Sequence, residues 1–171
     1  MLRSLLAAFI LSICTCMASA QASAPPQHQH LVANTNAIDG AVNPELIADS
    51  TAYRLCLFAW STAKNPSSDA LRHQQVQVAQ TGLDSNDQVT FVSILYDFRT
   101  KYDAAITAYN DSAKAALARN ETTDVHPLLQ TLDSLVQSTR GAINLQLSPA
   151  GAVRLHSFVV GEKKNMKVQE D

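Results

Sequence analysis

The fold of this chain is decided by its longest uninterrupted pattern, residues 84–120, which read DSNDQVTFVSILYDFRTKYDAAITAYNDSAKAALARN. The stretch contains neither proline nor glycine, and its apolar residues recur at spacings of three and four, as one face of an α-helix requires. One stripe consists of Val89, Val92, Tyr96, Arg99, Tyr102, Ile106, Tyr109, Ala113 and Leu117; a second consists of Phe91, Leu95, Phe98 and Ala105. A helix of roughly 35 residues is about 50 Å long, so we expect one long helix with a wide buried face.

The sequence on both sides of this stretch also has helical spacing. Asp49 offers a start for a helix that is apolar nearly all round up to Trp60, which predicts a central, buried helix. A more polar helix follows from residue 67 to about 81, and Gly82 is a natural stop for it.

Two more helices are expected after the long one. Asp124 caps a helix that Gly141 ends or bends, and Ser148 followed by Pro149 starts the last one. No alternating run predicts a strand. The predicted fold class is all-α, an elongated antiparallel bundle of four or five helices.

The amino-terminal residues resemble a targeting segment followed by a leader. Arg3, an apolar run and the small residues 18–20 predict a secretory signal peptide over 1–20, with cleavage before Gln21. A lipid anchor at Cys14 or Cys16 is the alternative, although neither cysteine follows the small residue that such anchors prefer. We expect a flexible leader over 21–42, the helical domain over 43–165 and a tail over 166–171.

Charge and cysteine content restrict the class of protein further. The net charge is -2 at pH 7, which argues against a nucleic-acid partner. No run outside the signal approaches the roughly 20 apolar residues of a membrane span, so no stable membrane insertion is expected after signal cleavage. Only Cys56 remains in the mature chain, which predicts no internal disulfide and a buried thiol. Exported, periplasmic or extracellular, is the predicted location.

Motifs that mark common enzymes and cofactor sites are missing from the sequence. There is no Gly-x-Ser-x-Gly elbow, no Ser-x-x-Lys, no phosphate-binding glycine loop and no haem-attachment motif. We therefore expect no cofactor and favour a non-enzymatic protein. A small hydrolase with an unrecognised site is a further hypothesis.

Two histidines in the leader form a candidate metal site. His28 and His30 flank one glutamine, and imidazole nitrogens are good ligands for copper, nickel or zinc. A firm site needs three or four ligands, and His73, His126 and His156 fall on three different predicted helices. The alternatives are a metal-binding or metal-stress protein using His28 and His30, or a solvated linker.

A candidate binding face lies on the long helix, where Tyr96, Arg99, Tyr102 and Tyr109 share one side. Aromatic rings beside a guanidinium suit a groove that grips extended polypeptide or a carbohydrate. The same residues also suit a bundle seam with its hydroxyl groups at the wet edge.

Several segments carry a resemblance to known families. Residues 43–47, 82–84, 147–151 and 162–167 are similar to segments of small exported all-helical bacterial proteins of uncharacterised function. A looser likeness is to the periplasmic Spy-type stress chaperones, whose helices open with Leu-Thr-x-x-Gln, although 83–88 departs from that spacing. The resemblance implies export and transfers no functional residue.

The hypothesis that follows is an exported, non-enzymatic helical protein. We expect it to bind a polypeptide or a second copy of itself, or to be an envelope-associated protein.

Overall fold

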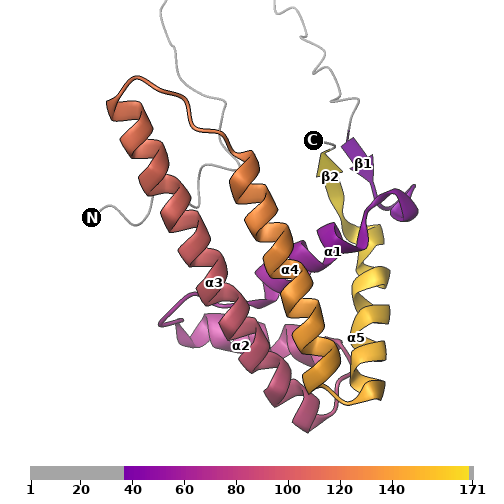
Figure 1. Cartoon of the computed structure of the whole chain (residues 1–171). Coiled ribbons are helices and arrows are strands. Elements are labelled where there is room, and N and C mark those ends of the chain that lie inside the picture. The colour runs from indigo at the N-terminus through magenta and orange to yellow at the C-terminus, as the bar shows by residue number, and fades with distance from the viewer. Residues whose placement is uncertain (1–36, 170–171) are drawn as a thin grey trace, which may run out of the picture. The chain divides into compact units, whose positions relative to one another are not determined.

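The all-α prediction is confirmed by the computed structural model, which describes residues 37–169 (Figure 1). The five helices are α1 (Asp49–Trp60), α2 (Ser68–Gln80), α3 (Ser85–Ala118), α4 (His126–Gln146) and α5 (Pro149–Glu162). Two 3-10 turns, Pro44–Leu46 and Lys163–Asn165, and two strands, β1 (Ala37–Asp39) and β2 (Lys167–Gln169), complete the chain order. The predicted signal peptide and most of the predicted leader lie outside the described residues.

Side-chain capping starts α2, α3 and α5. Asp124, predicted to cap α4, lies one residue before the N-cap Val125 and accepts a hydrogen bond from the backbone N–H of His126 at 3.0 Å. Asp84 accepts a hydrogen bond from the backbone N–H of Asp87 at 2.9 Å, and Ser148 accepts one from the N–H of Gly151 at 3.0 Å. Gly82, with φ +71°, follows α2 and allows the left-handed turn that stops it. Gly141 neither ends nor interrupts α4, which continues to Gln146.

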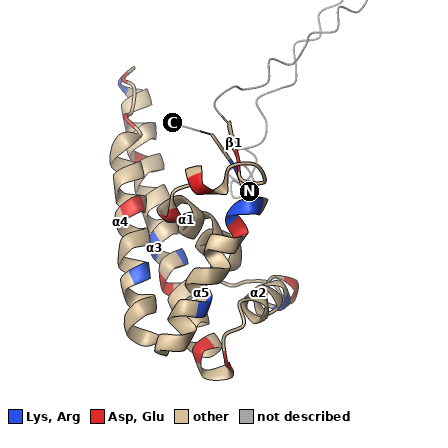
Figure 2. Ribbon diagram, turned by 90° about the vertical axis from the view of Figure 1, so that its right-hand side faces the viewer, with Lys and Arg blue, Asp and Glu red and all other residues tan. Residues whose placement is uncertain are grey.

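Helices α3 and α4 lie side by side and antiparallel, and both extend beyond the rest of the described domain (Figure 1). Helix α5 turns back beside the lower end of α4, while α1 crosses between α3, α4 and α5, and α2 lies across the lower end of α3. Turned by 90°, Figure 2 shows charged residues of both signs scattered over these helices without a continuous basic stripe.

The core lies where α3 meets α1, α4 and α5. Phe91, Leu95 and Phe98 of α3 have no exposed surface, and the Trp60 ring of α1 lies 6.1 Å from Phe91. The centroid of the Trp60 ring also lies 5.7 Å from that of the Phe158 ring of α5. Fully burying one such side chain contributes about 1.5–3 kcal/mol, so this aromatic junction holds three helices together.

The two stripes predicted on the long helix differ in role. The second stripe carries the core, whereas Val89, Tyr96 and Leu117 of the first stripe are 74%, 57% and 73% exposed. The other helices pack on the side of α3 that carries Phe91, Leu95 and Phe98, so Val89 and Tyr96 remain exposed in its lower half. Leu117 lies in the upper half, which packs against α4 alone.

The two ends of the described domain form a short antiparallel ladder that the sequence did not predict. Ile38 of β1 pairs with Val168 of β2, in segments expected to be leader and tail. Strands of three residues are too short to show alternation. Gly40 lets the chain turn into the domain: its N–H donates to the Met166 carbonyl at 2.9 Å, and a Cβ there would overlap the Lys163 carbonyl.

Candidate functional site

Three of the four residues predicted as a binding face gather on one surface with a fourth residue from α1. We call Phe58, Tyr96, Arg99 and Tyr102 the aromatic face. The Tyr102 ring lies 4.8 Å from the Phe58 ring and 5.8 Å from the Phe98 ring. Tyr102 therefore connects the buried core to the surface. Phe58, expected to be buried in an all-round apolar helix, is 41% exposed.

Arg99 is held in a fixed position at the centre of the aromatic face. Its guanidinium lies 4.6 Å from the centroid of the Phe58 ring, and its Nε donates to Asp103 Oδ1 at 2.9 Å. The arginine side chain is only 21% exposed. A cation over an aromatic ring contributes about 0.5–1 kcal/mol at such a site, and together the two contacts limit the rotation of Arg99.

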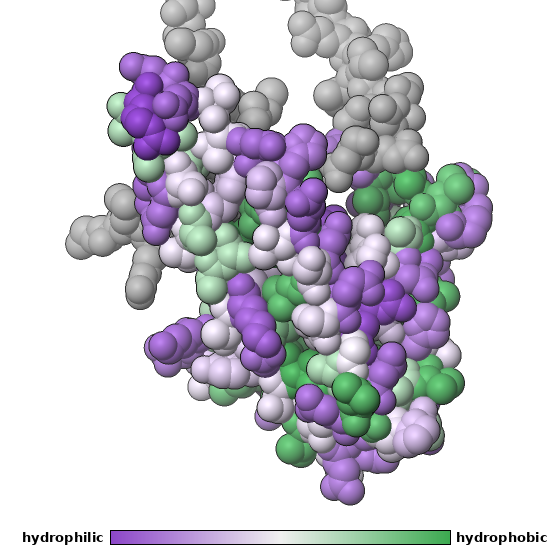
Figure 3. All heavy atoms as spheres, in the orientation of Figure 1, coloured by the Kyte–Doolittle hydropathy of each residue, from purple (hydrophilic) through white to green (hydrophobic). Residues whose placement is uncertain are grey.

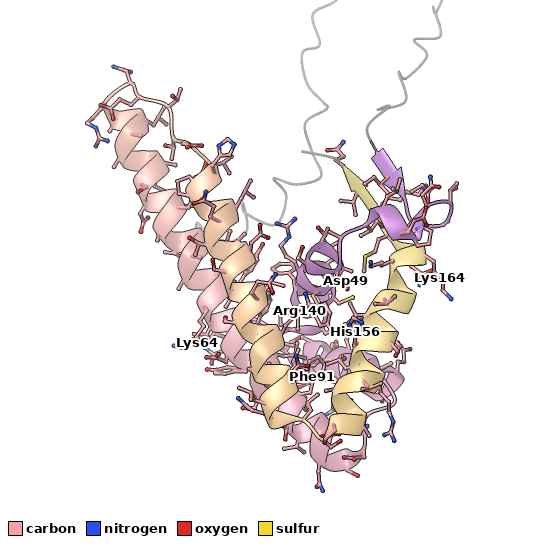
Figure 4. The ribbon with its side chains drawn as sticks, turned by 45° about the vertical axis from the view of Figure 1, so that its right-hand side comes forward. Asp49, Lys64, Phe91, Arg140, His156 and Lys164 are labelled. Atoms are coloured by element: carbon pink, nitrogen blue, oxygen red, sulfur yellow. The ribbon has the colours of Figure 1, made fainter. Side chains whose placement is uncertain are left out.

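A small pocket of about 110 Å³ adjoins this face. Its walls come from Tyr96, Arg99, Thr100 and Asp103 of α3 and from Thr62 and Lys64 of the loop after α1. The loop turns at Asn65, which has φ +62°. Lys64 is exposed, and no carboxylate of the described residues lies within 4.0 Å of its ammonium group. Figure 4 shows Lys64 on the α3 side of the domain, away from His156.

Tyr109 does not belong to the aromatic face. It lines a separate groove of about 540 Å³ near the turn between α3 and α4, walled by Ala105, Ala108, Ser112, Ala116, Pro127, Leu128 and Thr131 among others. The end of the hairpin is hydrophilic on the side that Figure 3 shows, and hydrophobic residues gather lower on that side. The structure therefore joins Tyr96, Arg99 and Tyr102 and separates Tyr109 from them.

A second group of polar residues was not predicted from the sequence. Tyr53 of α1, Arg140 of α4 and His156 of α5 meet on another side of the domain and are here called the Tyr53 cluster. The Tyr53 hydroxyl lies 3.3 Å from His156 Nδ1, and the two rings are stacked with centroids 6.1 Å apart. The Arg140 guanidinium lies 4.7 Å from the Tyr53 ring centroid.

An ion pair lies next to the Tyr53 cluster. Lys163 Nζ is 2.6 Å from Asp49 Oδ1, and Lys163 is only 8% exposed. This hydrogen bond from Lys163 lowers the pKa of Asp49 below its ordinary value, and burial raises the pKa of Tyr53. Asp49, Arg140 and His156 come together from three helices in Figure 4. These three residues are far apart along the chain, so no short sequence motif predicts that they lie together.

The histidines of the described helices do not form a metal centre. His126 Nδ1 lies 2.6 Å from Asp124 Oδ1, His156 contacts Tyr53, and His73 lies on α2. Within residues 37–169, no three His, Cys, Asp or Glu side chains are grouped so that they could hold a metal ion. His28 and His30 lie outside the described residues, and their metal site stays a prediction.

Cys56 is the free cysteine of the described domain, and it is buried. Burial raises the pKa of its thiol to about 12. A thiol with that pKa is almost entirely protonated near neutral pH, and the thiol is a poor nucleophile compared with the thiolate. The geometry gives Cys56 a packing role.

Searches for relatives return no match. No family model matches the chain, and no curated protein or solved structure is significantly similar to it. Among the helices of residues 37–169, none combines the length and the apolar character that crossing a membrane requires. The functions of the aromatic face and of the Tyr53 cluster must therefore be inferred from their own side chains.

Proposed function

We propose that this protein is exported and binds a polypeptide segment through the aromatic face, without catalysing a reaction. The observation that carries the proposal is the exposure of two aromatic side chains, Phe58 at 41% and Tyr96 at 57%, around an arginine whose rotation is restricted. Aromatic residues and arginine are enriched where proteins bind proteins, and rigid side chains lose little entropy on binding.

The size and charge of the adjoining pocket favour a polypeptide. Small-molecule sites usually measure about 300–1,000 Å³, whereas this pocket of about 110 Å³ has room for little more than one side chain. Asp103 of this pocket is paired with Arg99, and no carboxylate of the described residues lies within 4.0 Å of the Lys64 ammonium group. An apolar or aromatic side chain followed by an acidic one would match this surface.

Export is supported by the sequence of residues 1–20 and by the resemblance to small exported helical proteins. The test is the mass of the protein recovered from the extracytoplasmic fraction of an expressing bacterium. Cleavage before Gln21 is expected, and a chain that stays in the cytoplasm with an intact amino terminus would overturn this part of the proposal.

Binding is tested with the purified protein and an unfolded, reduced client whose aggregation is followed by light scattering. Tyr96→Ala and Phe58→Ala are expected to weaken suppression of aggregation. Val89→Ala is the matched control, because Val89 is a 74% exposed apolar residue of the same helix outside the aromatic face. Wild-type protein that neither suppresses aggregation nor retains an envelope protein in a pull-down would refute the proposal, as would equal losses in all three variants.

A further inference from the structure

Arg140 presents hydrogen-bond donors that the described domain does not use. Its guanidinium lies over Tyr53 at a centroid distance of 4.7 Å, yet no carboxylate of residues 37–169 lies within 4.0 Å of it. None of its N–H groups donates a hydrogen bond to another described residue. Arg140 is half-buried, so its position is set by packing while its donors remain available.

His156 adds a second donor beside Arg140. When the Tyr53 hydroxyl donates to Nδ1, the proton of the neutral imidazole is on Nε2, at the other edge of the ring. His156 is exposed, and its Nε2 has no hydrogen-bond partner among the described residues. Tyr53 therefore contacts both Arg140 and His156 and fixes how they lie relative to one another.

The carboxylate in this group does not pair directly with Arg140. Asp49 is the acidic residue of this group, and it is bound to Lys163 at 2.6 Å. Besides the hydrogen bond from Lys163, the charges of His156 and Arg140 help to lower the pKa of Asp49. The Asp49 carboxylate accepts its hydrogen bond from Lys163, however, so the Arg140 N–H groups stay without a carboxylate partner among the described residues. Figure 4 shows Asp49, Arg140 and His156 lying between α4 and α5.

We propose that Arg140 and His156, supported by Tyr53, bind the carboxylate of a small organic acid. The planar guanidinium fork matches the two oxygens of a carboxylate, and His156 supplies a further donor. The Tyr53 ring gives Arg140 an apolar support that limits its motion. Asp49 opposes the second negative charge of a phosphate, so a monoanion is preferred. This site lies apart from the aromatic face and is independent of polypeptide binding.

The experiment is a titration of the full-length purified protein with sodium acetate and with sodium benzoate, followed by NMR at constant ionic strength. Saturable shifts of the His156 ring resonances and of amides in α4 and α5 are expected for both carboxylates. Inorganic phosphate is expected to bind more weakly. Shifts that do not saturate, or phosphate binding tighter than either carboxylate, would overturn the proposal.

Variants separate the site from general electrostatics. Arg140→Gln is expected to weaken carboxylate binding about tenfold or more, because a charge-assisted, bidentate contact is lost. Arg140→Lys keeps the charge and the stacking stem but loses the fork, so it is expected to weaken binding as well. Arg154→Gln is the matched control: it removes one exposed cation from α5. Equal weakening by Arg154→Gln, or unchanged binding in Arg140→Lys and Arg140→Gln, contradicts the assignment.

Discussion

Replacing Gly151 by alanine should destabilise the domain, although alanine is the better helix former. Gly151 is a buried residue in the first turn of α5 and lies against the carboxylate of Asp87 from α3. That carboxylate accepts hydrogen bonds from the backbone N–H of Ser148 at 2.8 Å and from its hydroxyl at 2.6 Å. A Cβ at position 151 would overlap Asp87 Oδ2 and approach Ser148 Oγ to 3.1 Å.

The expected sign follows from two opposing effects. Alanine for glycine in a helix interior gains about 0.5–1 kcal/mol, whereas an extra methyl group in a packed position costs about 1–3 kcal/mol. We expect Gly151→Ala to lower the free energy of unfolding by about 1–2 kcal/mol in total. Gly141 is the control: it is exposed within α4, and no other side chain or distant backbone atom lies within 4 Å of the place an alanine methyl group would occupy, so Gly141→Ala should gain about 0.5–1 kcal/mol.

Urea unfolding followed by circular dichroism measures both variants. The expected separation of about 2 kcal/mol corresponds to about 4–8 °C in Tm for a chain of this size. Adding Asp87→Ala to each background isolates the contact: the cost of Gly151→Ala should shrink when the carboxylate is absent. If Gly151→Ala stabilises the protein as much as Gly141→Ala does, the proposed contact between α3 and α5 does not exist in solution.

Three other predictions address the same domain. The hydroxyl and backbone N–H of Ser148 hold the pKa of Asp87 below its ordinary value of 3.8. The stabilisation by these hydrogen bonds is therefore complete above pH 3.8 and disappears as the pH falls through the lower pKa of the folded protein. Urea unfolding near pH 7 and near pH 3 should show that the free energy of unfolding falls less on acidification in Asp87→Asn than in the wild-type protein. Cys56 should react with a thiol reagent much more slowly in native than in unfolded protein, and equally fast labelling would show that it is accessible. Phe98→Ala should lower the free energy of unfolding by about 3–5 kcal/mol, whereas Tyr96→Ala should change it by less than about 0.5 kcal/mol. Thermal unfolding measures both variants, and equal decreases in stability would mean that both residues face the core.

The helices of this fold could be predicted because their ends depend on neighbouring residues. Asp84, Ser148 and Gly82 act within a few positions of themselves, and the structure places helix ends at all three. The partner of Asp87, by contrast, could not be predicted from neighbouring residues. Asp87 lies three residues after the cap Asp84, where the acidic residue of a capping box would serve its own helix, but its carboxylate instead accepts from Ser148 at the start of α5.

The orientation of the long helix could not be derived from spacing alone. Its two stripes adjoin each other, and which one is buried depends on where the other helices pack. Tyr96, Arg99 and Tyr102 could be predicted to form one face because they lie on the same helix. Tyr53, Arg140 and His156 come from three helices, and a single sequence gives no measure of which helices approach each other.

The pairing of β1 with β2 brings the two ends of the described domain together. Ala37 and Gln169 are register partners, so the first and last described residues are immediate neighbours in space. A linker of a few residues should join them, and a permuted chain opened between α3 and α4, in the turn 119–125, would keep every helix intact. The order in which the helices are synthesised could thus be changed without changing how they pack.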